Sequence, residues 1–376
     1  MSGVDRISML PDAILVHILS FLPLKTVVTA TSTLSKRWRD LWQSIPIVDL
    51  DDSPFQLQGK LDRFVPFAFA VILSRDATLP ILNFRLKYRS ANVASSEVNL
   101  WLKTAIQRKV ETIELSPYFY SHVKLPTAIL TCSSLVVLKL KNLIVDRIST
   151  VQLPLLKTLH IDLVRFTNGE YLEMILSGCP NIHHLQIKGL ELQQSFIPLG
   201  VTFPNLIHVE LFLYQCKWIW IVRLLNNSPL LQVLDVGGDK LTRPMILPDP
   251  PYPKTVPGCL SSHLRACTLR NFLGHRADIR FAIYVLQNAR VLNKMTICCQ
   301  NPREEGDKYQ ILKKISKKSG PKIGPESNQP ASMGPILMSW LLIPTLRCCN
   351  CIFTLTIRVP GEPFLATAWS RTALGV

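Results

Sequence analysis

Charged residues are scarce in this sequence, at 18% of 376, while 48% of the residues are hydrophobic and the mean hydropathy is +0.22. This composition excludes an intrinsically disordered chain, which buries too little apolar surface to offset its conformational entropy. No heptad pattern runs through the chain and glycine is not abundant, at 16 residues, which excludes a coiled coil and a collagen. The 27 prolines predict many short elements with frequent breaks.

Acidic residues are few relative to basic ones, 26 against 42, which leaves a net charge of +16. The excess is concentrated near the C-terminus, because residues 251–300 hold seven basic and one acidic residue and residues 301–376 hold ten and five. A nucleic-acid-binding surface is usually a basic stripe mixed with aromatic side chains. We therefore predict no nucleic-acid partner. The lysines of residues 313–318 are interpreted as a solvated segment, with nuclear import as the alternative.

Motifs for catalysis, cofactors and metals are also lacking. The chain has no GxGxxG, GxxxxGK[ST], GxSxG or HExxH, and its ten cysteines form neither zinc-ligand pairs nor a compact disulfide framework. Cys348, Cys349 and Cys351 cluster without a histidine or a second cysteine pair. His184 and His208 occupy equivalent positions, but we interpret them as polar surface residues. The sequence thus predicts reduced cysteines, no metal, no cofactor and no catalytic residue.

Two apolar segments resemble membrane signals. Residues 13–22 follow an aspartate and lack a clear cleavage site, and residues 335–346 are shorter than the ~20 residues that a spanning helix needs. We expect a soluble intracellular protein without a membrane partner. A membrane-tethered protein that uses the C-terminal cysteines for lipidation is an alternative.

A repeated pattern, apolar-x-x-apolar-x-apolar, is the main signal in the sequence. Clear copies begin at Leu135, Leu156, Ile182, Leu206 and Leu231, with weaker copies on both sides. From Val110 onward successive copies start 25, 21, 26, 24, 25, 33 and 28 residues apart, close to the ~20–29 residues of leucine-rich repeats. Segments with helical spacing, such as residues 171–177 and 220–226, lie between copies. The pattern predicts an α/β solenoid of parallel strands that line a concave arc, with helices outside.

The same pattern assigns each residue to a face. The residue between the last two apolar positions alternates outward, onto the concave face. In order, this row is polar throughout: Asp49, Arg85, Glu114, Lys139, His160, Gln186, Glu210, Asp235, Thr268 and Thr296. We predict that five neighbours in the best-formed repeats bind a target protein: Lys139, His160, Gln186, Glu210 and Asp235.

Residues 1–45 do not follow the repeat. Pro11 and Asp12 suit the start of a helix that Pro23 ends, a second helix fits residues 25–31, and Ser35 suits the N-cap of a third over residues 36–43. Three short helices cannot bury Trp38, Trp42 and their many leucines and isoleucines unaided. We expect the repeats to cover part of this surface and another protein to cover the rest.

The residues of this module resemble the F-box of plant F-box/leucine-rich-repeat proteins. The resemblance rests on LPD at 10–12, on the apolar residues up to Pro23, and on LSKRWR at 34–39 with Leu41 and Trp42. It implies a three-helix F-box that docks on a Skp-type adaptor, which bridges to a cullin and a RING subunit. The implied docking residues are Leu10, Pro11, Ile14, Leu15, Ile18, Leu19, Leu22, Pro23, Leu34, Trp38 and Leu41. Lys36 and Arg37 are expected to pair with acidic residues of the adaptor.

The resemblance also divides the chain. Residues 256–264 resemble the start of an FBD region, so we expect an F-box at 1–45, leucine-rich repeats at 46–250 and an FBD-like region with terminal repeats at 251–328. Residues 329–376 show no repeat and no closing strand, and we expect a poorly ordered tail. The implied function is a non-catalytic substrate receptor of a ubiquitin ligase in the nucleus or cytoplasm. A non-ligase repeat scaffold or a degenerate paralogue is the alternative.

Overall fold

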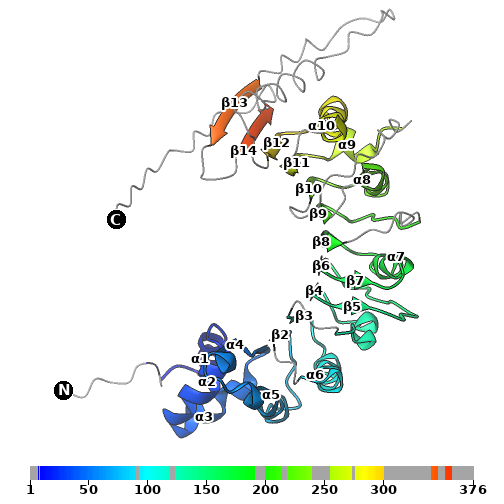
Figure 1. Ribbon diagram of the computed structural model, residues 1–376. Helices are drawn as coiled ribbons and strands as arrows, with labels where there is room; N and C mark the ends of the chain where they lie inside the picture. The colour runs from blue at the N-terminus through cyan, green and yellow to red at the C-terminus, as the bar shows by residue number, and fades with distance from the viewer. Residues whose placement is uncertain are drawn as a thin grey trace, which may run out of the picture.

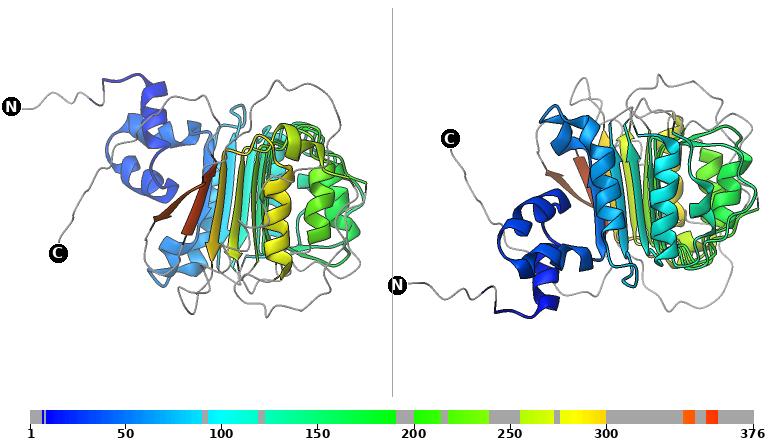
Figure 2. Two further views of the ribbon diagram at one scale, coloured as in Figure 1. Left: turned by 90° about the horizontal axis from the view of Figure 1, so that it is seen from above. Right: turned by 90° about the horizontal axis from the view of Figure 1, so that it is seen from below.

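The structure is a computed structural model that describes residues 7, 9–89, 93–118, 123–190, 200–213, 218–238, 255–272, 276–299, 340–345 and 352–357. These residues form an arc whose inner face is lined by strands and whose outer face is covered by helices, with a helical module at the N-terminal end (Figure 1). Views along the perpendicular direction show the strands running side by side (Figure 2). This architecture confirms the predicted α/β solenoid behind a helical module. The lysines of residues 313–318 lie outside the described residues.

The N-terminal module contains three short helices: α1 (Asp12–Leu19), α2 (Leu24–Ala30) and α3 (Lys36–Leu41). Pro11 and Pro23 precede the first two helices, where the missing N–H costs nothing, and Asp12 lies at the positive end of the α1 dipole. Ser35 is the extended N-cap residue of α3. The third helix ends two residues earlier than expected, because a 3-10 turn (Trp42–Ser44) leads into the first strand.

Ten parallel strands follow one another in chain order through the main sheet. They are β1 (Ile47–Asp51), β2 (Asn83–Tyr88), β3 (Thr112–Pro117), β4 (Val137–Lys141), β6 (Thr158–Asp162), β8 (His184–Leu190), β9 (His208–Leu213), β10 (Val233–Gly238), β11 (Ala266–Phe272) and β12 (Lys294–Cys299). A two-stranded sheet of β5 (Ile144–Val145) and β7 (Arg165–Phe166) lies beside it.

Helices or 3-10 turns connect most of these strands on the outer side (Figure 1). The connecting elements are α4 (Ser53–Gln56), α5 (Phe64–Leu73), α6 (Ser95–Gln107), the 3-10 turn η4 (Thr127–Thr131), α7 (Glu170–Ser177), α8 (Trp218–Asn226), α9 (Gly258–Ser262) and α10 (Arg276–Asn288). In α6, α7 and η4 apolar residues at helical spacing face inward and are buried.

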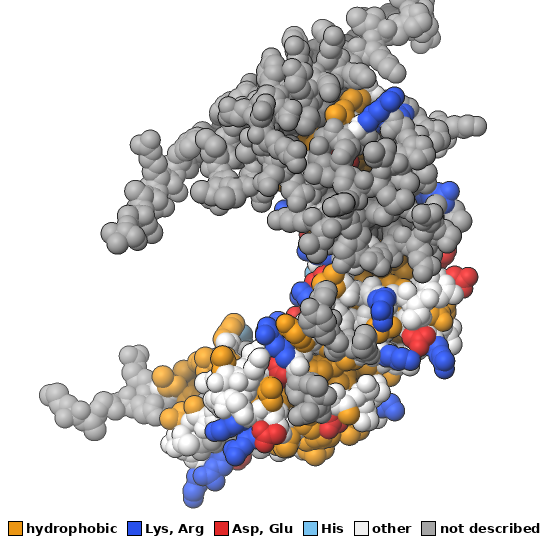
Figure 3. All heavy atoms as spheres, in the orientation of Figure 1, with side chains coloured by type: hydrophobic (Ala, Val, Ile, Leu, Met, Phe, Trp, Pro, Cys, Tyr) orange, Lys and Arg blue, Asp and Glu red, His pale blue; other side chains and the backbone are white. Residues whose placement is uncertain are grey.

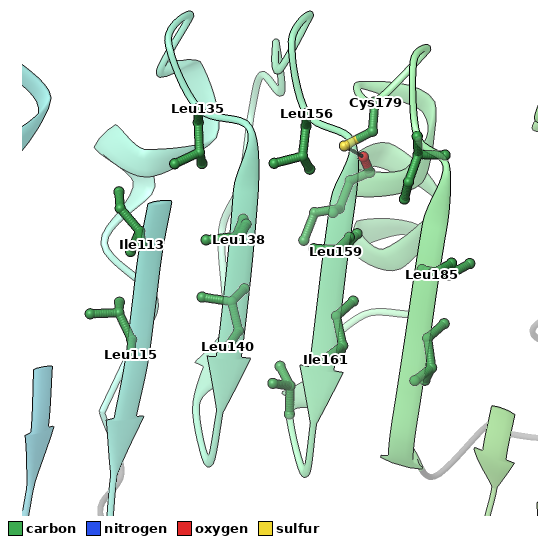
Figure 4. Packing of buried hydrophobic residues seen from close by; sticks show 14 of the residues in the cluster. Ile113, Leu115, Leu135, Leu138, Leu140, Leu156, Leu159, Ile161, Cys179 and Leu185 are labelled. Atoms are coloured by element: carbon green, nitrogen blue, oxygen red, sulfur yellow. Dashed lines mark hydrogen bonds between the residues drawn. The ribbon is translucent and has the colours of Figure 1, made fainter. Parts of the chain in front are cut away.

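The apolar positions of the repeat stack in columns from strand to strand. Leu138 of β4 pairs in register with Leu159 of β6, which pairs with Leu185 of β8. Figure 4 shows these side chains side by side on neighbouring strands. Leu140 and Ile161 belong to a second column, which lies two residues further along the strands. All five are at most 1% exposed. Because burial of one leucine contributes about 1.5–3 kcal/mol, the columns are the main source of stability in the solenoid.

Four repeats have a left-handed residue three positions after their concave-face residue. Asn142, Leu163, Gly189 and Asn271 have φ between 52° and 63°. Asparagine and glycine tolerate this conformation, and the Asn142 side chain donates to the Pro117 carbonyl of the preceding repeat at 2.9 Å. A Cβ on Gly189 would lie 2.3 Å from Leu163 Cδ2. These four repeats therefore share a backbone irregularity at one position, which in β8 and β11 coincides with a shift in strand register.

The tail differs from the expectation. The segments β13 (Trp340–Thr345) and β14 (Ile352–Ile357) are strands, and β14 pairs antiparallel with β12 while β13 pairs with β14. The expectation that this region has no closing strand was therefore wrong for these twelve residues. A repeat pattern does not detect such strands, because an antiparallel hairpin at the end of a sheet need not carry the repeat. The remaining residues of 329–376 lie outside the described residues.

The columns predict a sharp contrast between two neighbours on β6. Leu159 is fully buried, so Leu159→Asp places an unpaired carboxylate in the core and should lower the free energy of unfolding by several kcal/mol. Thr158 is half-buried on the concave face, and Thr158→Asp should change it by less than about 1 kcal/mol. Urea denaturation of both variants measures the difference. Equal destabilisation would show that the strand register is wrong.

Candidate docking surfaces

The N-terminal module exposes an unusual amount of apolar surface. Seven of the fourteen exposed large hydrophobic side chains among the described residues lie between residues 7 and 34: Ile7, Met9, Ile14, Ile18, Phe21, Leu22 and Leu34. Figure 3 shows apolar side chains gathered on this module. A concentration of exposed apolar side chains on one module indicates a protein-binding site. We call these seven residues the apolar surface.

The expected docking residues divide into two groups. Ile14, Ile18, Leu22 and Leu34 are 47%, 42%, 47% and 65% exposed, Pro11 and Pro23 are exposed, and Leu10 is half-buried. Leu15, Leu19, Trp38 and Leu41 are at most 7% exposed and belong to the core. Their expected contact with the adaptor stays a prediction. They support the apolar surface from beneath.

Trp42 is also buried, at 8% exposure, so both tryptophans are covered without a partner. The module shares one hydrophobic cluster with the first repeats, and Lys25 of α2 lies over the Phe55 ring of α4 with its ammonium 3.8 Å from the ring centroid. The repeats therefore cover the tryptophans, and the surface expected to meet another protein consists of other residues.

The two predicted basic residues have different surroundings. Lys36 is exposed. Arg37 donates through Nε to Asp12 Oδ1 at 2.8 Å, and it also donates to the Leu10 carbonyl, which ties α3 to the start of α1. Its guanidinium is thus engaged within the chain, and its expected pairing with the adaptor stays a prediction. Ile7, Met9 and Phe21 were missed by the sequence reasoning. Ile7 and Met9 precede α1 and Phe21 follows it, so all three lie outside the helical stripe.

The concave face carries the ten polar residues predicted for it. Each of the ten is the register partner of the next, from Asp49 opposite Arg85 on β1 and β2 to Thr268 opposite Thr296 on β11 and β12. Lys139, His160, Gln186, Glu210 and Asp235 therefore lie side by side on five adjacent strands. Their proposed role in target binding remains a prediction.

Most charges in this row already have partners on neighbouring strands. Arg85 lies 3.4 Å from both Asp49 and Glu114, and Lys139 Nζ lies 3.8 Å from Glu114 Oε2. Glu210 accepts from Gln186 Nε2 at 2.5 Å and lies 3.6 Å from Lys188 Nζ. Burial acts against ionisation of Glu210, but these partners together hold its pKa below the ordinary value. The row is an ion-pair network that joins successive repeats.

Asp235 is the most deeply buried of the charged residues in this row, with 8% of its side chain exposed. Arg270 of β11 donates to it from Nε at 2.9 Å and from a terminal nitrogen at 2.6 Å. This hydrogen bonding to Asp235 raises the pKa of Arg270. Gly237 lies between Arg270 and Phe212, and a Cβ there would come within 3.1 Å of both side chains.

Two histidines lie beside this network. The rings of His184 and His208 meet edge to face with centroids 5.7 Å apart, and His208 Nε2 lies 3.7 Å from Glu210 Oε1. Burial, followed by the nearby His208 and His183, lowers the pKa of His184. No group of three or more His, Cys, Asp or Glu in the described part of the chain is arranged to hold a metal ion.

Buried thiols pack in the core instead of forming a reactive site. Cys132, Cys179, Cys259 and Cys267 are free and buried. Burial raises the pKa of Cys179 and Cys267 to about 12 and that of Cys259 to about 11, so these thiols stay protonated at neutral pH. None of the described helices combines the length and apolar character that crossing a membrane requires.

Comparison with known proteins agrees with this arrangement. The F-box domain matches residues 7–49, the LRR repeats of FBD-associated F-box protein At5g56370 match residues 98–197, and FBD matches residues 252–297. F-box/FBD/LRR-repeat protein At4g00160 of Arabidopsis thaliana is 30% identical, over 83% of this chain and 90% of its own length. The chain belongs to the F-box/FBD/LRR-repeat family.

Other members of the family in Arabidopsis thaliana align over similar or shorter lengths. F-box/FBD/LRR-repeat protein At4g26340 is 25% identical over 83% of this chain and 97% of its own length. F-box/LRR-repeat protein 13 is 36% identical over 49% of this chain and 41% of its own length. The resemblance drawn from the sequence is confirmed. The F-box implies a Skp-type adaptor as partner. All residues of the apolar surface lie within residues 7–49, the segment that matches the F-box domain.

The Asp235–Arg270 pair predicts a measurable coupling between the last repeats of this F-box/FBD/LRR-repeat protein. Arg270→Met leaves a buried carboxylate without its partner and should cost about 2 kcal/mol, discounted because Arg270 is half-exposed. Adding Asp235→Asn should recover part of that loss. Urea denaturation of wild type, both single variants and the double variant gives the coupling free energy. A coupling near zero would show that the pair is not formed.

His184 predicts loss of stability in mild acid. Its folded pKa lies below the ordinary 6.5, so the unfolded chain binds the proton more readily and stability falls as the pH drops through that value. The melting temperature should fall between pH 7.5 and 5.5, and His184→Gln should make that fall smaller. The pKa of His160 is lowered by burial and by Lys139, so His160 contributes to the acid destabilisation of wild type and of the His184→Gln variant alike. An identical fall would contradict the prediction.

Proposed function

We propose that this chain is the substrate-recognition subunit of a Skp–cullin–F-box ubiquitin ligase. The F-box docks on the Skp-type adaptor, which joins the chain to cullin and RING subunits, and the concave face of the repeats holds the target protein. Catalysis takes place on the ubiquitin-conjugating enzyme, so this chain needs no nucleophile and no cofactor. The nucleus and the cytoplasm are the proposed compartments.

One observation carries the proposal: the seven residues of the apolar surface are exposed on a module that is otherwise folded and packed against the repeats. Exposure of so many large apolar side chains in a stretch of 28 residues is costly in water and is relieved by a partner. The F-box match at residues 7–49 supports a Skp-type adaptor as that partner.

The supporting residues make the surface rigid. Leu15 and Leu19 alternate with Ile14 and Ile18 along α1, so one side of the helix is held in the core while the other faces solvent. The bond from Arg37 to the Leu10 carbonyl holds the chain that leads into α1. A surface preorganised in this way loses little conformational entropy when a partner binds.

Ile14→Asp combined with Ile18→Asp should abolish adaptor binding. Both side chains are more than 40% exposed, so the change should leave the module folded, while two charges in a buried interface should weaken binding at least about 100-fold. Isothermal titration of the full chain with a purified plant Skp-type adaptor measures the effect, and circular dichroism monitors the fold. Adaptor affinity equal to that of wild type would refute the proposed docking surface.

Leu155→Asp is the matched control, because Leu155 is 53% exposed but lies in the repeats far along the chain. It should leave the adaptor affinity unchanged. Trp38→Ala is unsuitable as a contact test, because Trp38 is buried and its loss would unfold the module. Co-purification of cullin through the adaptor separates the ligase subunit from the alternative, a non-ligase repeat scaffold or a degenerate paralogue. An adaptor complex that recruits no cullin would favour that alternative.

A further inference from the structure

Two parallel rows of residues cross the middle of the concave face on the strands β3, β4, β6, β8, β9 and β10. The ion-paired row is the one described above: Glu114, Lys139, His160, Gln186, Glu210 and Asp235. The neutral row lies two residues earlier on the same strands: Thr112, Val137, Thr158, His184, His208 and Val233. Each of its members is the register partner of the next. Residues two apart share a face, so both rows face the inside of the arc.

The ion-paired row has little charge to offer a partner. Lys139 is paired with Glu114, Glu210 with Gln186 and Lys188, and Asp235 with Arg270. A partner charge placed here has to compete with a pair that already exists, and half-exposed pairs contribute little net free energy. This row therefore joins the repeats to one another more than it attracts a target.

The neutral row has the opposite character. It contains no Asp, Glu, Lys or Arg over six consecutive strands, and its side chains are half-buried or exposed. It offers the hydroxyls of Thr112 and Thr158, the methyl groups of Val137 and Val233, and the edge-to-face imidazoles of His184 and His208. A charged side chain pressed against this row would lose its hydration without gaining a counter-charge. An uncharged one would not.

The spacing of the strands sets a minimum length for the partner, because uncharged positions continue the row to Asn83 and Ile47 on β2 and β1 and to Ala266 on β11. Six adjacent strands at about 4.8 Å span about 24 Å, which an extended chain at about 3.4 Å per residue covers in about seven residues. A segment that crosses the strands cannot join the backbone hydrogen bonds of the sheet. Its N–H and C=O groups therefore need side chains as hydrogen-bond partners. Threonine hydroxyls and imidazoles both donate and accept hydrogen bonds and supply them.

We propose that the neutral row is the contact surface for the target and that it takes an extended, uncharged polypeptide segment of at least about seven residues. This inference rests on the proposed function, because it takes the concave face to be the target-binding face. It moves the main contact from the ion-paired row predicted from the sequence to the row beside it. The ion-paired row then borders the segment, and the neutral row disfavours charged sequences because it offers them no counter-charge.

Peptide selection on the purified full-length chain tests the inference. A displayed library of random ten-residue peptides is selected against the immobilised protein, and single binders are synthesised with a fluorophore for anisotropy titrations. We expect binders with a run of about seven residues free of Asp, Glu, Lys and Arg. Because no ion pair forms, their affinity should change less than about threefold between about 50 and 500 mM NaCl.

Variants locate the binding surface. Thr158→Lys and Val137→Lys should each weaken peptide binding at least about tenfold, because a charge then lies within the neutral row. Thr158→Ser, which stays uncharged and keeps the hydroxyl, should retain affinity within about threefold. Glu114→Gln with Lys139→Gln removes both members of one pair in the ion-paired row and should also stay within about threefold. Gln107→Lys adds the same charge on the exposed side of α6 and serves as the matched control.

Three results would overturn the inference: charged binders that depend on Glu114 and Lys139, full affinity in both lysine variants, or a selection without binders. Adaptor titrations on the same preparations keep the two proposals separate. If the peptides bind as expected but the chain does not bind the adaptor, the proposed function is refuted and the inference about the neutral row is not. If the chain binds the adaptor normally but the lysine substitutions at Thr158 and Val137 do not weaken peptide binding, only the inference about the neutral row is refuted.

Discussion

The burial of one apolar column against the next is the interaction on which the whole molecule depends. A single repeat has one apolar face and nothing within itself to cover it, so Leu138 needs Leu159, and Leu159 needs Leu185. This dependence aligns the strands residue by residue, because a slip of one position would move every leucine to the solvent side. The polar rows on the concave face are aligned by the same constraint, although they contribute much less to stability.

The two candidate surfaces follow from different positions relative to these columns. The F-box lies at the end of the stack, where Leu15, Leu19, Trp38 and Trp42 join the shared core and the remaining apolar side chains have no repeat to cover them. The concave face lies along the stack, where strands about 4.8 Å apart bring opposite charges within reach of each other. One surface is therefore apolar and uncovered, whereas the other is polar and largely satisfied.

Much of the fold and part of the site were predictable from the sequence. The period of the repeat placed ten strands and assigned Lys139, His160, Gln186, Glu210 and Asp235 to one row, because alternation along a strand is a local property. The family resemblance placed the F-box. The division of its apolar residues was not predictable, because α1 is apolar on most of its surface and the choice of Leu15 over Ile14 for the core depends on what α3 and the 3-10 turn after it present to α1.

The sequence by itself determined the repeat, the direction in which each strand residue faces, and the family, since all three depend on spacing along the chain. Only the tertiary structure decided which charges neutralise one another, that Arg37 joins Asp12 and Leu10, and that two segments of the tail add strands to the end of the sheet. These features depend on distances between residues far apart in the chain. Such distances arise only after the columns have packed, because packing is what brings neighbouring repeats into contact.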